Sequence, residues 1–318
     1  MTSAAVDLGG TRIKLGLIEG SSLQYFKIIP ASPENGLKDL LPEIKGQISE
    51  AVETLALDLK DLSGIGISFP GLVNSKENRI LSAPVAKYSD AASLDLKKWA
   101  LKSFALPIVV ENDANMALLG EWKYGAGKDC DNLVMVTLGT GIGTSVIING
   151  EPLRGVHFQA GCLGGHFTLD ANGDKCICGN YGCIEMQTSK GALLKMLKSE
   201  REITNSSLFN EKKPDFKKLF EHAKQKDALA KKILGHILKI WGIALVNLIH
   251  AYDPEKIIIS GGIIGADYPI VQKLQEFVNK HAWTPWGEVK IVKALNPDSA
   301  ALFGAHFKLN ELIIKKSL

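Results

Sequence analysis

The chain has 318 residues, of which 46% are hydrophobic and 22% are charged, and its formal net charge at pH 7 is +3. This composition is typical of a soluble globular protein of one or two domains, and so small a net charge gives no reason to expect a nucleic acid or a membrane as partner. The first residues do not form a secretory signal, no apolar run reaches the roughly 18 residues of a spanning helix, and an odd number of cysteines argues against a disulfide framework. We therefore expect a cytoplasmic protein.

Short runs rich in β-branched residues alternate along the chain with longer segments of helical periodicity. Strands are expected at 4–8, 13–18, 65–69, 108–111, 133–138, 144–148, 256–260 and 289–293. Helices are expected at 37–57, 114–124, 189–198, 227–251, 268–280 and 300–312. This alternation predicts a layered α/β fold with helices on the faces of sheets. The polar segment 199–217 is interpreted as a surface connection.

One internal repeat is visible. VDLGGTRIKLGLIEGSSL begins at Val6, and VTLGTGIGTSVIINGEPL begins at Val136. Each copy has the pattern of a strand, a Gly/Thr turn, a second strand and a second Gly turn. The repeat predicts two similar α/β domains that face each other, with the two Gly/Thr turns bordering one cleft. The alternative is that glycine-rich hairpins recur by chance.

The first Gly/Thr turn, DLGGT, has the residues of a phosphate-binding loop. Gly9 and Gly10 allow backbone N–H groups to converge without side-chain obstruction, and Thr11 adds a hydroxyl donor. Asp7 ends the preceding strand, where we expect it to hold Mg²⁺, since hard cations prefer carboxylate and water oxygens. Lys14 follows in the next strand and would direct its charge toward the phosphates.

The second turn, LGTGIG, supplies another set of small residues and hydroxyls. Neither turn is a Walker loop or a dinucleotide fingerprint, because each leads into a strand rather than a helix. The candidate phosphate contacts here are Gly139, Thr140, Gly141 and Gly143. The alternative is that both are ordinary tight turns that bind no phosphate. The occurrence of two such similar turns in one chain makes this alternative weaker.

In LPIVVENDANMALLGEW, Asn112 and Asp113 stand where a buried strand gives way to a helix. Ligands bind at the carboxyl ends of strands in α/β sheets, so Asp113 is a candidate general base for a substrate hydroxyl, with Asn112 bonded to a neighbouring hydroxyl. An aspartate here can also simply cap the following helix. In phosphoryl transfer the protein mainly positions the reactants and neutralises charge, so one well-placed carboxylate is sufficient as the catalytic base.

Three of the five cysteines fall in the short stretch DKCICGNYGCIE. Cys176, Cys178 and Cys183, together with His166, make a Cys₃His set of the kind that forms closed structural zinc sites. The alternative is a group of small buried cysteines without a metal. A zinc-fixed loop would hold the Glu185 carboxylate rigidly, and His166 would offer its second ring nitrogen to a ligand hydroxyl. Two polar groups oriented by a metal in this way indicate a sugar site.

The motifs VDLGGTRIKLGL, FPGLVN, ENDANMALLGEW, TLGTGIG, GGH, CICGNYGCIE, DPEKIIISGGIIG and ALFGAHF span nearly the whole chain. In these motifs the chain resembles the ROK family (repressors, open reading frames and sugar kinases) of the actin/hexokinase-like superfamily. The resemblance implies ATP-dependent phosphorylation of a hexose or N-acyl hexosamine, most often at the 6-hydroxyl, with ATP, catalytic Mg²⁺ and structural Zn²⁺. By family pattern Asp113 is the base, and the sugar hydroxyls are contacted by Asn112, His166 and Glu185, with Gly71 bordering the sugar. On the nucleotide side, both Gly/Thr turns hold phosphates, and Gly261 and Gly262 lie under the nucleotide. The zinc ligands His166, Cys176, Cys178 and Cys183 match one by one.

The resemblance also implies two actin-like (ribonuclease H-like) domains that face a cleft, with the zinc-stapled loop in the second. We place the N-terminal domain at 1–113 and 302–318, and the larger C-terminal domain at 114–301. Family members that repress transcription carry an N-terminal helix-turn-helix, for which the start at Val6 of the first motif leaves no room. Related kinases are often homodimers, and we expect a homo-oligomer.

One position departs from the family pattern. Where the family usually has G-E-[I/L]-G-H, this chain has Leu163 in place of the Glu and Gly164 in place of the aliphatic residue. The family's Glu contacts hydroxyls near the anomeric end of the sugar, so its loss puts glucose in doubt as the substrate. A sugar-sensing relative without turnover is the main alternative, and an actin-like ATPase acting on protein partners is a further one, which the zinc loop does not favour.

Overall fold

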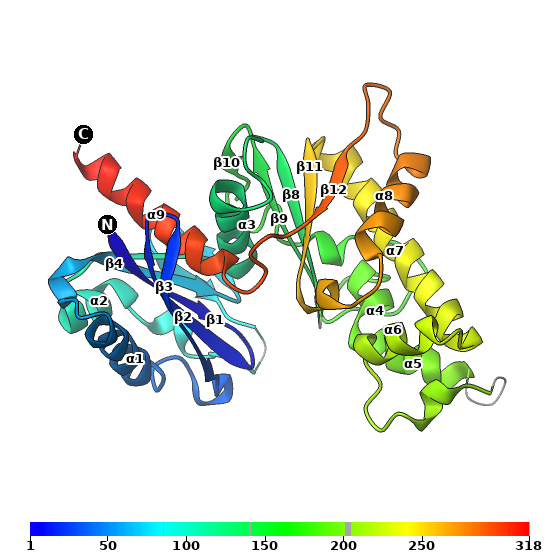
Figure 1. Cartoon of the computed structure of the whole chain (residues 1–318), viewed down its shortest axis with the longest axis horizontal. Helices are drawn as coiled ribbons and strands as arrows, with labels where there is room; N and C mark the ends of the chain where they lie inside the picture. The colour runs from blue at the N-terminus through cyan, green and yellow to red at the C-terminus, as the bar shows by residue number, and fades with distance from the viewer. Residues whose placement is uncertain (85, 140, 201–204, 318) are drawn as a thin grey trace. The chain divides into compact units, whose positions relative to one another are not determined.

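The computed structural model of the chain describes residues 1–84, 86–139, 141–200 and 205–317. The chain forms two compact units, each built on one five-stranded sheet (Figure 1). The N-terminal unit consists of Met1–Asp129, Arg154–Ala160 and Asp298–Leu318, and the C-terminal unit of Cys130–Leu153 and Gly161–Pro297.

The sheet of the N-terminal unit has the strand order β3-β2-β1-β4-β7. β1 is antiparallel to β2, β2 is antiparallel to β3, and β1, β4 and β7 run parallel. The strands are β1 (Thr2–Leu8), β2 (Arg12–Glu19), β3 (Ser22–Pro30), β4 (Leu62–Phe69) and β7 (Ile108–Asn112), and a separate hairpin is formed by β5 (Leu72–Asn74) and β6 (Arg79–Ser82).

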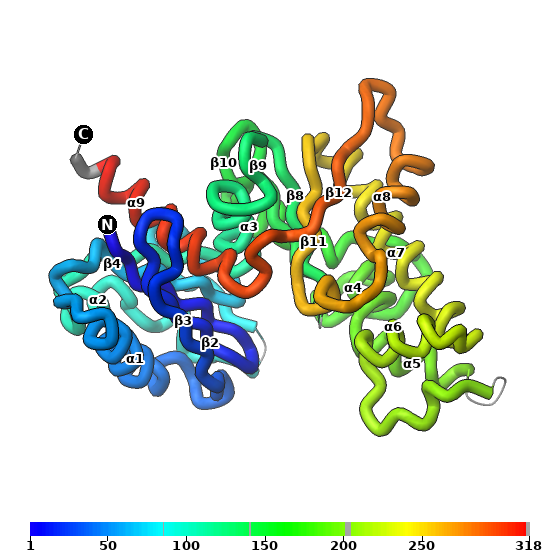
Figure 2. Tube along the Cα trace, in the orientation of Figure 1, coloured from blue at the N-terminus to red at the C-terminus, as the bar shows by residue number. Residues whose placement is uncertain are grey.

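Helices cover both faces of this sheet, because successive side chains of a strand point to opposite faces. Ala4 and Val6 of β1 pack in one apolar cluster with α1 (Leu41–Thr54) and α2 (Leu96–Phe104), while Ala5 packs in another with α3 (Asp113–Tyr124) and α9 (Ala300–Ser317). The C-terminal helix α9 thus completes the N-terminal unit (Figure 2). Short 3₁₀ turns are η1 (Pro33–Asn35), η2 (Leu59–Asp61) and η3 (Ala91–Ser93).

The sheet of the C-terminal unit has the order β10-β9-β8-β11-β12 and repeats the strand directions of the first sheet. Its strands are β8 (Leu133–Leu138), β9 (Ile142–Ile148), β10 (Glu151–Pro152), β11 (Lys256–Ser260) and β12 (Lys290–Lys293). Val6 lies in β1 and Val136 in β8, the corresponding central strands. The prediction from the sequence repeat of two similar α/β sheets is therefore confirmed.

Most helices of the C-terminal unit pack around α7. They are α4 (Ile184–Thr188), α5 (Lys190–Glu200), α6 (Phe216–Lys224), α7 (Ala228–Tyr252) and α8 (Ile270–His281), with 3₁₀ turns η4 (Gly164–His166), η5 (Ser207–Asn210) and η6 (Gly262–Gly265). In the described part of the chain α7 alone has the length and apolar composition of a membrane-spanning helix, and 61% of its most apolar window is buried. Such burial is what a core helix shows.

The boundaries of the two units differ from the expected ones because α3 packs closely on α9. Gly120 of α3 and Gly304 of α9 allow the two backbones to approach so nearly that a Cβ on either would collide with a carbonyl of the other helix. α3 therefore belongs to the N-terminal unit, whereas the sequence-based division placed it after the boundary at residue 113. Segment Arg154–Ala160, expected in the second domain, also groups with the N-terminal unit.

Candidate functional site

Three polar residues of the N-terminal unit stand side by side at the carboxyl ends of its parallel strands. Asp7 of β1 is paired in register with Ser68 of β4, and the next residue of β4, Phe69, is paired with Asn112 of β7. The Ser68 hydroxyl donates to Oδ1 of Asp7 at 2.7 Å. This edge is where α/β sheets bind their ligands, and it contains both the expected Mg²⁺ carboxylate and the expected base.

Asn112 caps α3, and Asp113 is the first residue inside the helix. The side-chain oxygen of Asn112 accepts hydrogen bonds from the N–H groups of Ala114 (3.1 Å) and Asn115 (3.2 Å). Its amide nitrogen donates to the Gly71 carbonyl and to Oδ1 of Asp113, both at 3.1 Å. Oδ1 of Asp113 also accepts from the Ala114 N–H, at 2.8 Å. Asn112 is the capping residue, and the Asp113 carboxylate is held in place by this N–H and by the Asn112 amide.

The electrostatic surroundings of Asp113 suit a general base. Burial raises the pKa of Asp113 to about 6, and the negative charge of Asp7 adds to this rise. The pKa of Asp7 is also raised, by burial, although the Ser68 hydroxyl and Lys14 act in the opposite direction. A carboxylate whose pKa lies near neutrality can accept a proton and release it again at physiological pH.

The first Gly/Thr turn is closed by a hydrogen bond from the Gly9 N–H to the Arg12 carbonyl at 3.0 Å. Lys14 lies directly opposite Asp7 across the β1–β2 hairpin. Its ammonium is 3.3 Å from Oδ1 of Asp298, a carboxylate that is 82% exposed, so this ion pair is weak and easily exchanged for another anion. The hairpin brings together the five residues that the sequence predicted for this turn: Asp7, Gly9, Gly10, Thr11 and Lys14.

A buried charge cluster beneath the Asn112–Asp113 pair was not predicted from the sequence. Glu111 is 1% exposed, and its Oε2 accepts from Nη2 of Arg154 (2.8 Å) and Nζ of Lys308 (3.0 Å). Its other oxygen accepts from the Asn112 N–H at 3.0 Å and from the Asn115 side chain at 3.4 Å. Burial by itself would raise the pKa of Glu111, but the two cations outweigh burial and lower it. The cluster therefore anchors the backbone immediately before the candidate base.

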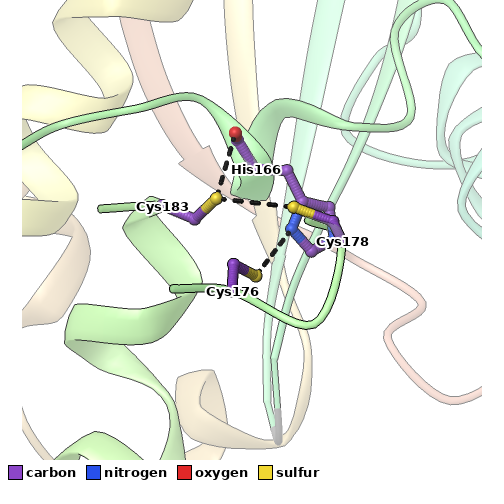
Figure 3. A group of neighbouring side chains, drawn as sticks. All are labelled: His166, Cys176, Cys178 and Cys183. Carbon is purple, nitrogen blue, oxygen red and sulfur yellow. Dashed lines mark hydrogen bonds between the residues drawn. The ribbon is translucent and has the colours of Figure 1, made fainter. Parts of the chain in front are cut away.

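In the C-terminal unit, the three cysteines and the histidine of the predicted zinc site converge (Figure 3). Their ligand atoms all lie within 4.8 Å of one another. Cys176 Sγ is 3.5 Å from Nδ1 of His166, and Cys178 Sγ is 3.7 Å from Cys183 Sγ. A tetrahedral zinc with bonds of about 2.3 Å to sulfur and about 2.0 Å to nitrogen needs separations of about 3.5 Å for S···N and 3.8 Å for S···S. The donor set and its spacing fit zinc.

Glu185 lies against the second Gly/Thr turn. It is in the first turn of α4, two residues after Cys183. Its Oε2 accepts from the Ile142 N–H at 2.9 Å. Within this turn the Gly139 N–H donates to the Gly141 carbonyl at 3.1 Å, and Gly143 stands in β9 opposite Thr137. Thr140, the remaining residue predicted for this turn, lies outside the described residues.

A cavity of about 750 Å³ opens beside the second turn in the C-terminal unit. Gly139 and Gly262 line it, together with residues of α6 that the sequence did not single out: Phe216, Lys217, Phe220 and Lys224. Gly261 has φ 98° and packs on the Leu138 backbone, so a side chain at this position would be strained and would also collide. The walls also include three carboxylates, those of Asp215, Glu221 and Asp267, and Lys224 is paired with Asp267. A cavity of this volume with aromatic side chains and charges of both signs suits the nucleoside part of a nucleotide.

The loop that carries His166 is held rigidly on β9. The Thr144 hydroxyl donates to the Gly161 carbonyl at 2.7 Å and accepts from the Gly164 N–H at 2.8 Å. A Cβ on Gly164 would lie 2.6 Å from the Thr144 methyl group, which explains why this position has no side chain. Leu163, the residue that replaces the family's Glu, begins this rigid turn and is 44% exposed.

Each unit therefore gathers its own part of the predicted site. Asp7, the first turn, Gly71, Asn112 and Asp113 belong to the N-terminal unit, and the second turn, the Cys₃His cluster, Glu185, Gly261 and Gly262 belong to the C-terminal unit.

Known proteins resemble the whole chain. A family model described as "ROK family" matches residues 3–311. The chain is 31% identical over 315 residues to a glucokinase from Thermotoga maritima, with 97% of each sequence covered. It is 32% identical over 289 residues to a xylose repressor from Bacillus subtilis, with 90% of this chain and 70% of the repressor covered. A solved ROK family glucokinase from Streptomyces griseus, in complex with glucose and AMPPNP, has a TM-score of 0.79 at 26% identity, covering 98% of this chain and 100% of that one.

Proposed function

Because the chain belongs to the ROK family, we propose that it transfers the terminal phosphoryl group of ATP to a hexose or an N-acyl hexosamine. The observation that carries this proposal is the Asp113 carboxylate, whose pKa is raised to about 6 and which shares a sheet edge with Asp7 of the first turn. A base and a cation-binding carboxylate at one ligand-binding edge are the parts that phosphoryl transfer requires of the protein.

In this proposal Asp113 accepts the proton of the attacking hydroxyl, which we assign to the 6-position of the sugar. The hydroxyl oxygen forms a bond to the terminal phosphorus, and the bond from that phosphorus to the bridging oxygen of ADP breaks. Asn112, whose amide is fixed by Gly71 and Asp113, binds a neighbouring hydroxyl. The Gly71 backbone borders the sugar.

The phosphates are assigned to the two Gly/Thr turns and to Gly261 and Gly262. Asp7 would hold Mg²⁺, which when bound supplies charge neutralisation for the phosphates. Lys14, whose ion-pair partner is the exposed Asp298 and whose charge also acts on Asp7, is available to add a positive charge. The cavity beside Gly139 and Gly262 is assigned to the nucleoside.

The zinc site serves the sugar indirectly. Coordination through Nδ1 of His166 leaves its Nε2 for a sugar hydroxyl, and the Cys183 ligand directly precedes the short helix that carries Glu185. Zinc would thus fix the orientation of two sugar-contacting side chains.

Replacing Cys178 by Ser should release the zinc and raise the KM for the sugar about 10-fold or more. The reason is that a structural zinc site holds its loop only with all its ligands present, and loss of a partner that orients a ligand contact commonly costs 10- to 100-fold. Zinc content by mass spectrometry and sugar kinetics are measured on the same preparation.

Cys130→Ser, which changes a cysteine outside the cluster, is the matched control and should keep both zinc and KM. Loss of zinc from Cys178→Ser with an unchanged KM would show that the metal does not support the sugar site.

Leu163 bears on which sugar is used. An exposed leucine accepts no hydrogen bond, so a sugar hydroxyl that the family's Glu would bind finds no acceptor here. We propose that the preferred substrate differs from glucose at the end of the ring that this residue faces.

Leu163→Glu should raise kcat/KM for glucose about 10-fold or more, because a hydrogen bond to a charged group contributes roughly 1.5–3 kcal/mol. Since Leu163 is exposed, the change should leave the fold intact. Leu163→Gln is the control, with a neutral acceptor and a smaller expected gain. Unchanged glucose kinetics in Leu163→Glu would remove this residue from the sugar site.

The same residue favours a second candidate, a sugar-binding protein without turnover. The deciding experiment is sugar-dependent ADP release by the wild-type protein with glucose, mannose, fructose, allose, N-acetylglucosamine and N-acetylmannosamine. Release with at least one sugar supports the kinase. Sugars that raise the melting temperature but release no ADP would support the sensor and contradict the kinase.

A further inference from the structure

Lys87 lies in the loop between β6 and η3, and its side chain reaches the first Gly/Thr turn. A Cβ built on Gly10 would lie 2.5 Å from the Lys87 ammonium nitrogen and 3.3 Å from its Cε. The three heavy atoms nearest to that Cβ all belong to Lys87. The φ of Gly10 is not in the left-handed range, so a side chain here would not strain the backbone, but the flexible end of Lys87 would have to move. The space beside Gly10 is thus taken by this lysine.

Tyr88 fixes the loop to the same turn. Its side chain is fully buried, and its hydroxyl donates to the Gly9 carbonyl at 2.7 Å. Its N–H donates to the Pro33 carbonyl at 2.7 Å, and its ring packs on Phe69 with centroids 5.7 Å apart. Burial raises the pKa of Tyr88 to about 12, with Asp7 and Glu34 adding to the rise, so the hydroxyl keeps its proton and remains a donor.

The backbone on both sides of Lys87 is strained. Ala86 has φ 60° and Tyr88 has φ 51°, and left-handed backbone costs roughly 1 kcal/mol for each non-glycine residue. Strain of this kind persists only where the surrounding contacts enforce it, and it is concentrated at functional sites. Here the contacts that enforce it are those of Tyr88, and their result is that Lys87 is held at the glycine turn.

The Lys87 ammonium has no carboxylate partner within 4.0 Å in the part of the chain that the structure describes. Lys14, on the other side of the turn, does have one in Asp298. An exposed lysine without a counter-ion, in a loop that Tyr88 fixes beside a glycine turn, is suited to an anion.

We propose that Lys87 is a catalytic residue that contacts the phosphoryl group being transferred and neutralises charge on it in the transition state. This inference rests on the proposed kinase function and extends its phosphate site by one cation from outside the glycine hairpin. Lysine acts on phosphate as a point charge, so its contribution depends on the position at which the Tyr88 anchor holds it.

Replacing Lys87 by Met should lower kcat for sugar-dependent ADP release about 10- to 100-fold, the range seen when one stabilising charge or donor is lost from such a site. The KM for the sugar should change less than about 2-fold, because the proposed contact of Lys87 is with the transferred phosphoryl group and not with the sugar. Lys87→Arg should recover part of the rate, and Lys45→Met, an exposed lysine of α1 in the same unit, should have no effect.

Gly10→Ala gives an independent test, since its methyl group would displace the Lys87 ammonium. We expect a loss of rate similar to that of Lys87→Met and no further loss in the double variant. Additive losses would show that the two residues act separately and would contradict the proposed contact.

Binding of inorganic tripolyphosphate by calorimetry separates this inference from the kinase proposal. We expect Lys87→Met to weaken tripolyphosphate binding even if no sugar is found to be phosphorylated, in which case the anion site stands and the kinase function fails. Normal turnover and normal tripolyphosphate affinity in Lys87→Met would overturn the role of Lys87. The role would also be overturned if the wild-type protein neither phosphorylated a sugar nor bound tripolyphosphate.

Discussion

Asp113→Asn should lower kcat/KM for sugar phosphorylation on the order of 10³-fold, the middle of the range for removal of a general base. The amide keeps the size of the carboxylate and can still hydrogen-bond, so the loss is expected in the chemical step and not in folding. The measurement is sugar-dependent ADP release, with the melting temperature recorded for the same sample.

Asp95→Asn is the matched control, since this exposed carboxylate only caps α2 through the Lys98 N–H and asparagine caps equally well. Its activity should equal that of the wild type. Activity in Asp113→Asn of more than about half the wild-type value would remove Asp113 from the role of base.

The pH dependence follows from the same group. A base acts when it is deprotonated, and the pKa of Asp113 is raised to about 6, so kcat/KM should fall as the pH decreases through 6 and reach about one tenth of its plateau near pH 5. This acid limb should be absent from the residual activity of Asp113→Asn.

Glu111→Gln should lower the free energy of unfolding by about 3–5 kcal/mol, the cost of breaking a buried ion pair and leaving its partner uncompensated. Here two cations, Lys308 and Arg154, would lose their shared carboxylate. The pKa of Glu111 is lowered in the folded protein. The Glu111 carboxylate should therefore contribute fully to the free energy of unfolding at pH values above its ordinary pKa of 4.5, and this contribution should decrease as the pH falls below that value. Denaturant unfolding at several pH values measures both effects.

Glu50→Gln is the control for this change. It removes the partner of Lys27 in an exposed ion pair at 2.6 Å, and we expect a loss much smaller than that of Glu111→Gln. A loss of the same size in Glu111→Gln would show that the cluster beneath the candidate base adds no more than a surface pair. Replacing Lys308 by Met in the Glu111→Gln background should recover part of the loss.

The sheets and the zinc cluster could be predicted from the sequence because their signals are local. The hairpins of β1–β2 and β8–β9 have the same strand and turn pattern, and Cys176, Cys178 and Cys183 stand within eight residues. Other elements have weaker local signals. β3 is an edge strand with alternating exposed and half-buried residues and few fully buried ones, and α6 is a short helix next to the polar segment, so neither was expected.

The contacts that position the candidate base could not be predicted because they join residues far apart in the sequence. Glu111 meets Lys308 across nearly two hundred residues, and nothing near either one indicates the other. Lys87 reaches Gly10 only because Tyr88 is bonded to Gly9, and the helix α3 joins the N-terminal unit only because α9 returns to it. Pairings of this kind are fixed by the tertiary fold.

Phosphorus NMR with proton correlation is the most direct test of sugar phosphorylation with Asp113 as base. The reaction contains wild-type protein, ATP-Mg²⁺ and the sugar that gives most ADP release. The account predicts a phosphomonoester whose phosphorus is coupled to the two protons of the 6-methylene group, and a rate of formation of this product on the order of 10³-fold lower with Asp113→Asn. ADP and inorganic phosphate as the only new signals, or an equal yield of sugar phosphate from Asp113→Asn, would contradict it.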